Sequence, residues 1–231
     1  MSLLKGGTML EVKDLTIKTL KGEKEIIKDL SFTVNKNDKL AIIGEEGNGK
    51  STLLKCIYNQ ELIKDYTYVT GKIIKNNLSI GYLKQFLESS WENQIVGDYF
   101  LKESPDSEID YEKYATIYKL DEIFKKLNLD YDKFENKLIG NLSGGEKVKV
   151  QIAKILLDSP DLLLLDEPTN DIDIETLEWL ENFILTSKVP IIFISHDEVL
   201  LEKVANGILH LEKINNKTKA RYTYEHIGYK E

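Results

Sequence analysis

A glycine-rich run at residues 44–52 has the residue types and spacing that bind the phosphates of a nucleotide. It fits the phosphate-loop pattern G-x-x-x-x-G-K-[S/T]. Backbone N–H groups of such a loop, together with the start of the following helix, favour an anion. Lys50 would reach the β- and γ-phosphates, and the Ser51 hydroxyl would bind Mg²⁺. The run therefore predicts that a nucleoside triphosphate is held by Gly44, Glu45, Glu46, Gly47, Asn48, Gly49, Lys50, Ser51 and Thr52.

The residues on either side of this loop supply the elements that would position it. The apolar run at 40–43 predicts a buried strand, and residues 53–57 predict a helix. Strand, glycine loop and helix form the context in which the pattern binds phosphate. The alternative is an ordinary glycine-rich turn between a strand and a helix.

Two adjacent carboxylates, Asp166 and Glu167, follow four leucines at 162–165. Such a continuous apolar run is typical of a strand buried on both faces, so both acids would lie at a strand end. Asp166 could hold Mg²⁺ through water together with Ser51, and Glu167 could polarise a water aimed at the γ-phosphate. The alternative is an acid pair at a helix N-terminus, where the helix dipole favours it.

Gln85 and His196 each follow an apolar strand pattern, at 78–83 and 191–194. Gln85 could ligate Mg²⁺ and sense the γ-phosphate, while His196 could hydrogen-bond that phosphate. Taken alone, each has a simpler interpretation, as a solvated glutamine and a structural histidine.

The run Leu-Ser-Gly-Gly-Glu at 142–146 has two compatible interpretations. Ser143 and Glu146 fit a capping box, and a helical apolar stripe follows them. Two glycines in a first turn are costly for a helix, but they let a phosphate approach backbone N–H groups. We therefore expect a helix cap that also presents an anion site formed by Ser143, Gly144 and Gly145.

The order of strand and helix patterns predicts an α/β fold with a mostly parallel sheet and ligands at the carboxyl edge of its strands. A stretch at 87–141 is rich in charged residues and helix formers, which predicts an inserted helical subdomain. Further strand patterns lie at 10–17, 26–34 and 72–74, helix patterns at 96–101, 118–127 and 174–184, and a loop pattern at 104–107.

The composition of the chain argues against several classes of function. The chain has 231 residues, a hydrophobic share of 42% and a net charge of −8. This charge argues against a surface built to bind nucleic acid, so we expect no direct DNA binding. No apolar run approaches a membrane span, no secretory leader is present, and the single cysteine, Cys56, is expected to be buried. A reduced cytoplasmic setting fits, and residues 1–8 read as a leader, either vector-derived or natural.

Together these motifs resemble the nucleotide-binding domain of the ATP-binding cassette (ABC) superfamily, over residues 9–231. The order matches: Walker A at 44–52, the Q-loop Gln85, the signature at 142–146, Walker B at Asp166 and Glu167, then the D-loop Asp173 and the switch His196. The resemblance implies a P-loop NTPase with a mostly parallel central sheet, an N-terminal antiparallel β-subdomain and an inserted helical signature subdomain. It places the core at about 9–85 and 156–231 and the helical subdomain at about 86–155.

A finer resemblance is to the ABC-F class of cytosolic proteins, which have paired cassettes, lack a membrane domain and act on ribosomes. It is carried by residues 143–147 and 165–181 and by the tyrosines at 222, 224 and 229. The chain departs from this class at Leu20, where an aromatic residue usually stacks on adenine, and at Glu198, where arginine is common. Leu20 implies adenine packing on aliphatic carbon, with weak discrimination between bases.

The resemblance implies an ATPase in which the Walker face of one cassette closes on the signature face of another, with Mg·ATP between them. Its catalytic residues would be Lys50, Glu167 and His196, its Mg²⁺ ligands Ser51, Gln85 and Asp166, and its contacts to the partner's nucleotide Ser143, Gly144 and Gly145. The expected partners are a second cassette, in a homodimer or a tandem chain, and the ribosome. Two alternatives stay open: the ATPase subunit of a transporter docked on a transmembrane permease, and a nucleotide-binding module that barely hydrolyses ATP.

Overall fold

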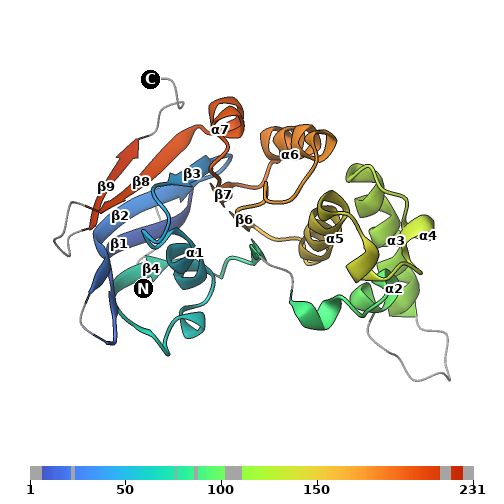
Figure 1. Ribbon diagram of the computed structural model, residues 1–231, viewed down its shortest axis with the longest axis horizontal. Helices are drawn as coiled ribbons and strands as arrows, with labels where there is room; N and C mark the ends of the chain where they lie inside the picture. Colours follow the sequence, from blue (N-terminus) through green and yellow to red (C-terminus); the bar gives the residue numbers. More distant parts are fainter. Residues whose placement is uncertain are drawn as a thin grey trace.

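The fold is described from a computed structural model, which covers residues 7–21, 24–75, 77–85, 88–101, 111–213 and 220–225. The molecule has a lobe built on β-sheets and a lobe of helices, side by side in Figure 1. The predicted loop at 104–107 and Tyr229 lie outside the described residues. Within them, none of the helices combines the length and the apolar composition that crossing a membrane requires.

The larger sheet is mostly parallel, as predicted. Its six strands have the order β5-β6-β7-β3-β8-β9, and the last pair is antiparallel. The strands are β3 (Lys39–Ile43), β5 (Ile80–Leu83), β6 (Leu162–Asp166), β7 (Ile191–Ile194), β8 (Gly207–Lys213) and β9 (Ala220–Glu225).

A smaller antiparallel sheet forms the N-terminal part of the chain, also as predicted. β1 (Thr8–Thr19) lies between β2 (Glu25–Asn35) and β4 (Thr67–Ile74). Leu10 and Val12 are buried, and so are Leu15 and Ile17, although the two pairs are three residues apart. A shift of register between Val12 and Leu15 adds one residue to β1 at this point. The side chains after the extra residue therefore point to the core again, as those before it do.

The larger sheet is covered on both faces, which explains the four consecutive leucines of β6. Leu162 and Leu164 pack in one core with α1 (Lys50–Tyr58) and the smaller sheet. Leu163 and Leu165 pack in the other with α5 (Gly144–Leu157), α6 (Ile174–Thr186) and α7 (Glu198–Val204). A strand buried on both faces needs no polar alternation.

The helical lobe contains α2 (Val96–Phe100), α3 (Tyr111–Lys126) and α4 (Tyr131–Phe134), with α5 lying between this lobe and the sheet (Figure 1). Aromatic rings fill its centre. Phe124 meets Phe100, Tyr131 and Phe134 edge to face, with ring centroids 5.1 to 6.2 Å apart. Short 3₁₀ turns occur at Gln60–Leu62, Ser89–Trp91 and Ile139–Asn141.

Several element boundaries differ from the sequence prediction, most of all in α3, which begins at Tyr111 rather than at residue 118. α1 begins at Lys50 rather than at residue 53, because the polar residues of its first turn carry no apolar periodicity. β4 extends the short pattern at 72–74 back to Thr67, and β5 begins at Ile80, two residues later than predicted. Besides the short 3₁₀ turns, the elements α4, α7, β8 and β9 were not predicted individually.

Candidate nucleotide-binding site

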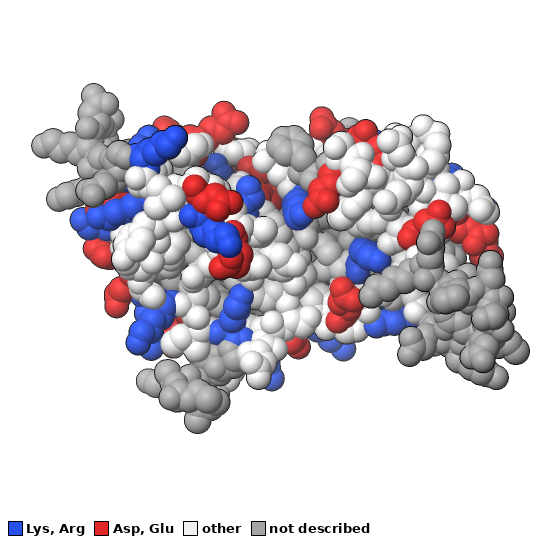
Figure 2. All heavy atoms as spheres, turned by 90° about the horizontal axis from the view of Figure 1, so that it is seen from below, with Lys and Arg blue, Asp and Glu red and all other residues white. Residues whose placement is uncertain are grey.

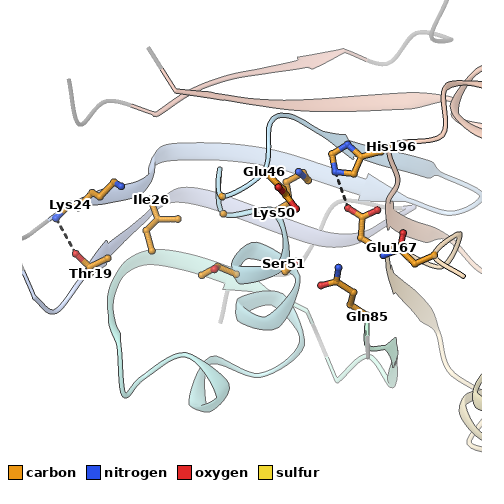
Figure 3. Close-up of a pocket in the computed structure, with 13 residues that line it drawn as sticks. Thr19, Lys24, Ile26, Glu46, Lys50, Ser51, Gln85, Glu167 and His196 are labelled. Atoms are coloured by element: carbon orange, nitrogen blue, oxygen red, sulfur yellow. Dashed lines mark hydrogen bonds and ion pairs between the residues drawn. The ribbon is translucent and has the colours of Figure 1, made fainter. Parts of the chain in front are cut away.

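A cavity of about 540 Å³ opens where the phosphate loop meets the carboxyl edge of the larger sheet (Figure 3). Its volume suits a small-molecule ligand such as a nucleotide. Its walls combine the phosphate loop, the start of α1 and the residues that follow β5, β6 and β7. The lining residues are Thr19, Lys24, Ile26, Glu46, Gly47, Gly49, Lys50, Ser51, Thr52, Gln85, Glu167, Asn170 and His196.

The phosphate loop turns into α1 through Gly49, which has φ 89° and is the N-cap of the helix. This left-handed conformation favours glycine. A side chain here would also overlap the Cγ2 methyl of Ile26. Because glycine has no side chain to cap the helix, the amides of the first turn are left for an anion in the cavity.

Lys50 lies over this loop, and only 6% of it is exposed. Its Nζ donates hydrogen bonds to the carbonyl oxygens of Gly44 at 2.7 Å and Glu45 at 3.1 Å. Burial lowers the pKa of Lys50, while the charges of Glu167, Glu46 and Asp166 oppose the change. In Figure 3 Glu46 lies beside this ammonium group, so a carboxylate faces the place where phosphate would bind.

Ser51 and Asp166 form the part of the site that could hold a metal ion. The Ser51 hydroxyl donates to Asp166 Oδ1 at 2.9 Å, and Asp166 is 2% exposed. Burial raises the pKa of Asp166, and the hydrogen bonds from Tyr82 and Ser51 oppose it. Mg²⁺ takes few protein oxygens besides water and substrate phosphates, so a hydroxyl beside a carboxylate fits this ion. In the part of the chain that is described, no group of three or more His, Cys, Asp or Glu side chains forms another metal site.

Glu167 and His196 meet at the mouth of the cavity, with Glu167 Oε1 3.2 Å from His196 Nε2 (Figure 3). The Glu167 side chain is 9% exposed and that of His196 is 56% exposed. Burial raises the pKa of Glu167, whereas His196 and Lys50 lower it. The parallel pairing of Asp166 with Ile194 brings the two strand ends together, which is why residues so far apart in sequence are neighbours.

Some predicted residues lie outside the cavity lining. Leu20 is 55% exposed in the turn after β1, where its N–H donates to the Tyr66 carbonyl at 3.1 Å. The Asn48 amide donates to the carbonyl of Leu211 at 3.0 Å and so ties the loop to β8. Gly44 and Glu45 contribute the carbonyls that hold Lys50.

Other lining residues were missed by the sequence analysis. Thr19, Lys24 and Ile26 flank the turn in which Leu20 was singled out, and Asn170 follows the acid pair by three residues. Their nearness in sequence to recognised motifs was the only signal available. Tyr82, which donates to Asp166 Oδ2 at 2.9 Å, carried no signal beyond its place in a strand pattern.

The signature run forms the predicted capping box. Glu146 N–H donates to Ser143 Oγ at 3.2 Å, and Ser143 N–H donates to Glu146 Oε2 at 2.8 Å. A methyl group on Gly144 would overlap the carbonyl of Asp171, and one on Gly145 would overlap the Thr176 hydroxyl. The residues of this turn are not among those that line the cavity, so the structure does not bring it to the chain's own phosphate loop.

Comparison with known proteins agrees with the motifs and the fold. A protein family described as "ABC transporter" matches residues 27–170. The chain is 38% identical over 194 residues to the ATP-binding protein Uup of Buchnera aphidicola, covering 82% of this chain and 30% of that protein. It is 35% identical over 207 residues to the energy-dependent translational throttle protein EttA of Escherichia coli, covering 88% of this chain and 35% of that protein. ABC transporter F family member 5 of Arabidopsis thaliana is 30% identical over 225 residues, covering 81% of this chain and 32% of that protein.

The chain thus spans about a third of the length of these relatives. Among solved structures, a nucleotide-free ATP-binding cassette from an ABC transporter superposes with a TM-score of 0.70 at 22% identity, covering 88% of this chain and 87% of that chain. The two folds are therefore alike. With the phosphate loop, the signature run and the Walker B acids in the order of that family, the chain belongs to the ABC transporter family of ATP-binding proteins and is most like one cassette of an ABC-F protein.

Proposed function

We propose that this chain is an ATP-hydrolysing cassette that closes on a second cassette around Mg·ATP, within a cytoplasmic ABC-F-like protein that acts on the ribosome. The observation that carries the proposal is one cavity lined by Lys50, Ser51 and the Glu167–His196 pair, with Asp166 hydrogen-bonded to Ser51 behind its wall. These groups would supply the phosphate contacts, the metal site and the base that phosphoryl transfer to water requires.

Each side chain has a role that follows from its position. Lys50 would exchange its loop carbonyls for the β- and γ-phosphates, which relieves the cost of burying its charge. Ser51, Asp166 and Gln85 would hold Mg²⁺, which when bound neutralises phosphate charge. Glu167 would accept a proton from the attacking water, because a raised pKa makes its carboxylate a stronger base.

His196 supports this base in two ways. Its imidazole holds the Glu167 carboxylate at 3.2 Å, and its exposed side chain leaves the second ring nitrogen for the γ-phosphate. The imidazole therefore fixes where the water must be deprotonated. We assign it to positioning and to the stabilisation of phosphate charge.

The proposal of a pair follows from the signature turn. Its capping geometry offers amides at the start of α5, yet the turn does not contribute to the cavity at the chain's own phosphate loop. A second cassette, in a homodimer or a tandem chain, would bring such a turn to that cavity. We treat residues 9–231 as one nucleotide-binding domain, with residues 86–155 as its helical signature subdomain.

The ribosome is the proposed partner because two relatives carry names that point to the ABC-F class or to translation. The ATPase subunit of a membrane transporter is the second candidate, favoured by the cassette fold shared with a transporter protein. Both share the hydrolytic site and differ in the partner.

The Glu167→Gln variant tests the hydrolytic part. We expect its turnover to fall by at least about 100-fold, because an amide cannot accept the proton. ATP binding should persist and should favour a dimer. Phosphate release, calorimetry and light scattering measure the three quantities. Glu178→Gln, an exposed change on α6, serves as the control and should leave all three unchanged.

Hydrolysis at the wild-type rate in Glu167→Gln would refute the role of this base. Co-sedimentation of the same variant with ribosomes, in the presence of ATP, tests the partner. Binding to membrane vesicles that contain a permease, without binding to ribosomes, would favour the transporter alternative.

A further inference from the structure

Tyr82 connects the strand β5 to the acid at the end of β6. The two strands are parallel, with Tyr82 paired to Leu164, so the Tyr82 side chain lies beside the residues that lead to Asp166. Its hydroxyl donates a hydrogen bond of 2.9 Å to Asp166 Oδ2. Its ring packs on Tyr58 at the end of α1, with ring centroids 5.2 Å apart.

Both oxygens of the Asp166 carboxylate are therefore occupied by hydroxyl groups. Ser51 Oγ donates to Oδ1 and Tyr82 Oη donates to Oδ2, each at 2.9 Å. These two donors differ in what they can do next. Ser51 lines the cavity and is the hydroxyl group that a metal ion would bind. The Tyr82 side chain extends from β5 to Tyr58 of α1 and does not line the cavity.

When Ser51 turns its oxygen toward a cation, Oδ1 loses its hydrogen-bond donor. Tyr82 then remains as the group that prevents the buried carboxylate from rotating about its Cβ–Cγ bond. A phenol is a hydrogen-bond donor at neutral pH, so the Tyr82 hydroxyl can keep donating to Oδ2.

We propose that Tyr82 is a positioning residue for the magnesium site: its hydroxyl group fixes the Asp166 carboxylate so that Oδ1 faces Ser51 and the cation. This inference rests on the proposed function, since it requires that Ser51 and Asp166 hold Mg²⁺. Groups that orient a metal ligand in this way commonly change metal affinity by about 10- to 100-fold when removed.

The test is Tyr82→Phe, which removes one oxygen and keeps the ring. Calorimetry measures the affinity for ATP at increasing Mg²⁺ concentration and in excess EDTA. We expect the Mg²⁺ concentration for half-maximal enhancement of ATP binding to rise by about tenfold, as for loss of a group that orients a metal ligand. The affinity in EDTA should equal that of the wild type. Tyr58→Phe, which changes the partner ring, is the matched control and should leave both quantities unchanged.

A second readout uses Mn²⁺ in place of Mg²⁺. The electron paramagnetic resonance spectrum of Mn²⁺ bound with ATP should broaden or shift in Tyr82→Phe and stay unaltered in Tyr58→Phe. An unchanged Mg²⁺ requirement would overturn the inference. So would an equal loss of ATP affinity with and without Mg²⁺, because that pattern indicates packing. If wild-type protein showed no Mg²⁺-dependent ATP binding, the proposed function would fail instead.

Discussion

Glu167 has φ 53°, a left-handed conformation that residues with a side chain adopt only when their surroundings hold it. Its N–H donates to the Ile194 carbonyl at 3.1 Å, and its own carbonyl accepts from Asn170 N–H at 3.3 Å. The turn sends two consecutive carboxylates in different directions, Asp166 to Ser51 and Glu167 to His196. The sequence predicted two acids at a strand end. It also assigned them separate roles, beside Ser51 and toward water, but it gave no sign of the left-handed backbone at Glu167 or of the contact with His196.

At Leu20 we predict weak discrimination between bases. Leu20 is exposed and follows Thr19, which lines the cavity. A leucine has no aromatic ring on which a base could stack. Wild-type affinities for ATP and GTP should therefore agree within about threefold, and Leu20→Tyr should bind ATP up to about tenfold more tightly, since stacking on one base is worth roughly 1–3 kcal/mol. Calorimetry measures both affinities.

The control for this change is Leu185→Tyr, at an equally exposed leucine near the end of α6. It should leave nucleotide affinity unaltered. A strong preference of the wild type for ATP over GTP would contradict the assignment of Leu20 to the position beside the base.

At the scale of single elements, the start of α5 combines a helix cap with the proposed contact to the partner's nucleotide. Ser143→Ala should lower the free energy of unfolding by about 1 kcal/mol, because the hydroxyl that accepts from Glu146 N–H is lost. Ser143→Asp should stay within about 0.5 kcal/mol of the wild type, since aspartate is also a good N-cap. Urea denaturation measures both differences.

The same pair of variants separates the cap from the nucleotide contact. Introduced together with Glu167→Gln, Ser143→Asp should abolish the dimer formed with ATP, because its carboxylate would face a phosphate. Light scattering measures the dimer. An ATP dimer as stable as that of the Glu167→Gln parent would exclude Ser143 from the interface.

Elements with strong local patterns were predicted well, and those without them were not. The capping box and its apolar stripe predicted α5, and the leucine run predicted β6. α7 has only seven residues, too few to show helical periodicity clearly. β8 pairs with β3, a contact between segments far apart in the chain that leaves no mark on β8 alone, and β9 in turn pairs with β8.

For the whole molecule, we predict a stability that depends on pH through Lys39. This lysine opens β3, is 5% exposed, and donates from Nζ to the carbonyls of Ser187 at 2.9 Å and Val189 at 2.8 Å. Burial lowers its pKa from 10.5 to about 8, against the influence of Asp38. Between these two values the unfolded chain holds a proton that the folded chain has released, so raising the pH favours the folded state.

The expected change is a rise of about 1–2 kcal/mol in the free energy of unfolding between about pH 8 and about pH 9.5, relative to Lys39→Met. Urea denaturation of both proteins at each pH measures it, and the comparison cancels the titration of other groups. A difference that stays constant or falls as the pH rises would show that Lys39 keeps its proton in the folded state.

The assembly of the site was predictable only in part. Residues after parallel strands must meet at one edge of a sheet, which is why Gln85, Glu167 and His196 share a cavity as expected. The separation of the signature turn from that cavity was implied by the resemblance to the ABC superfamily alone, because it depends on how the two lobes pack and no local pattern encodes it. On the face shown in Figure 2, basic and acidic side chains are interspersed rather than gathered by sign.

The close packing of Gly144 on Asp171 has a mechanical consequence. Main chain touches main chain there, with no flexible side chain between them to absorb a displacement. A tilt of α5 at its first turn must therefore move the segment that follows Glu167, or the two must separate. A displacement at the start of α5 can in this way shift Glu167, the acid that would deprotonate water, through the segment that follows it.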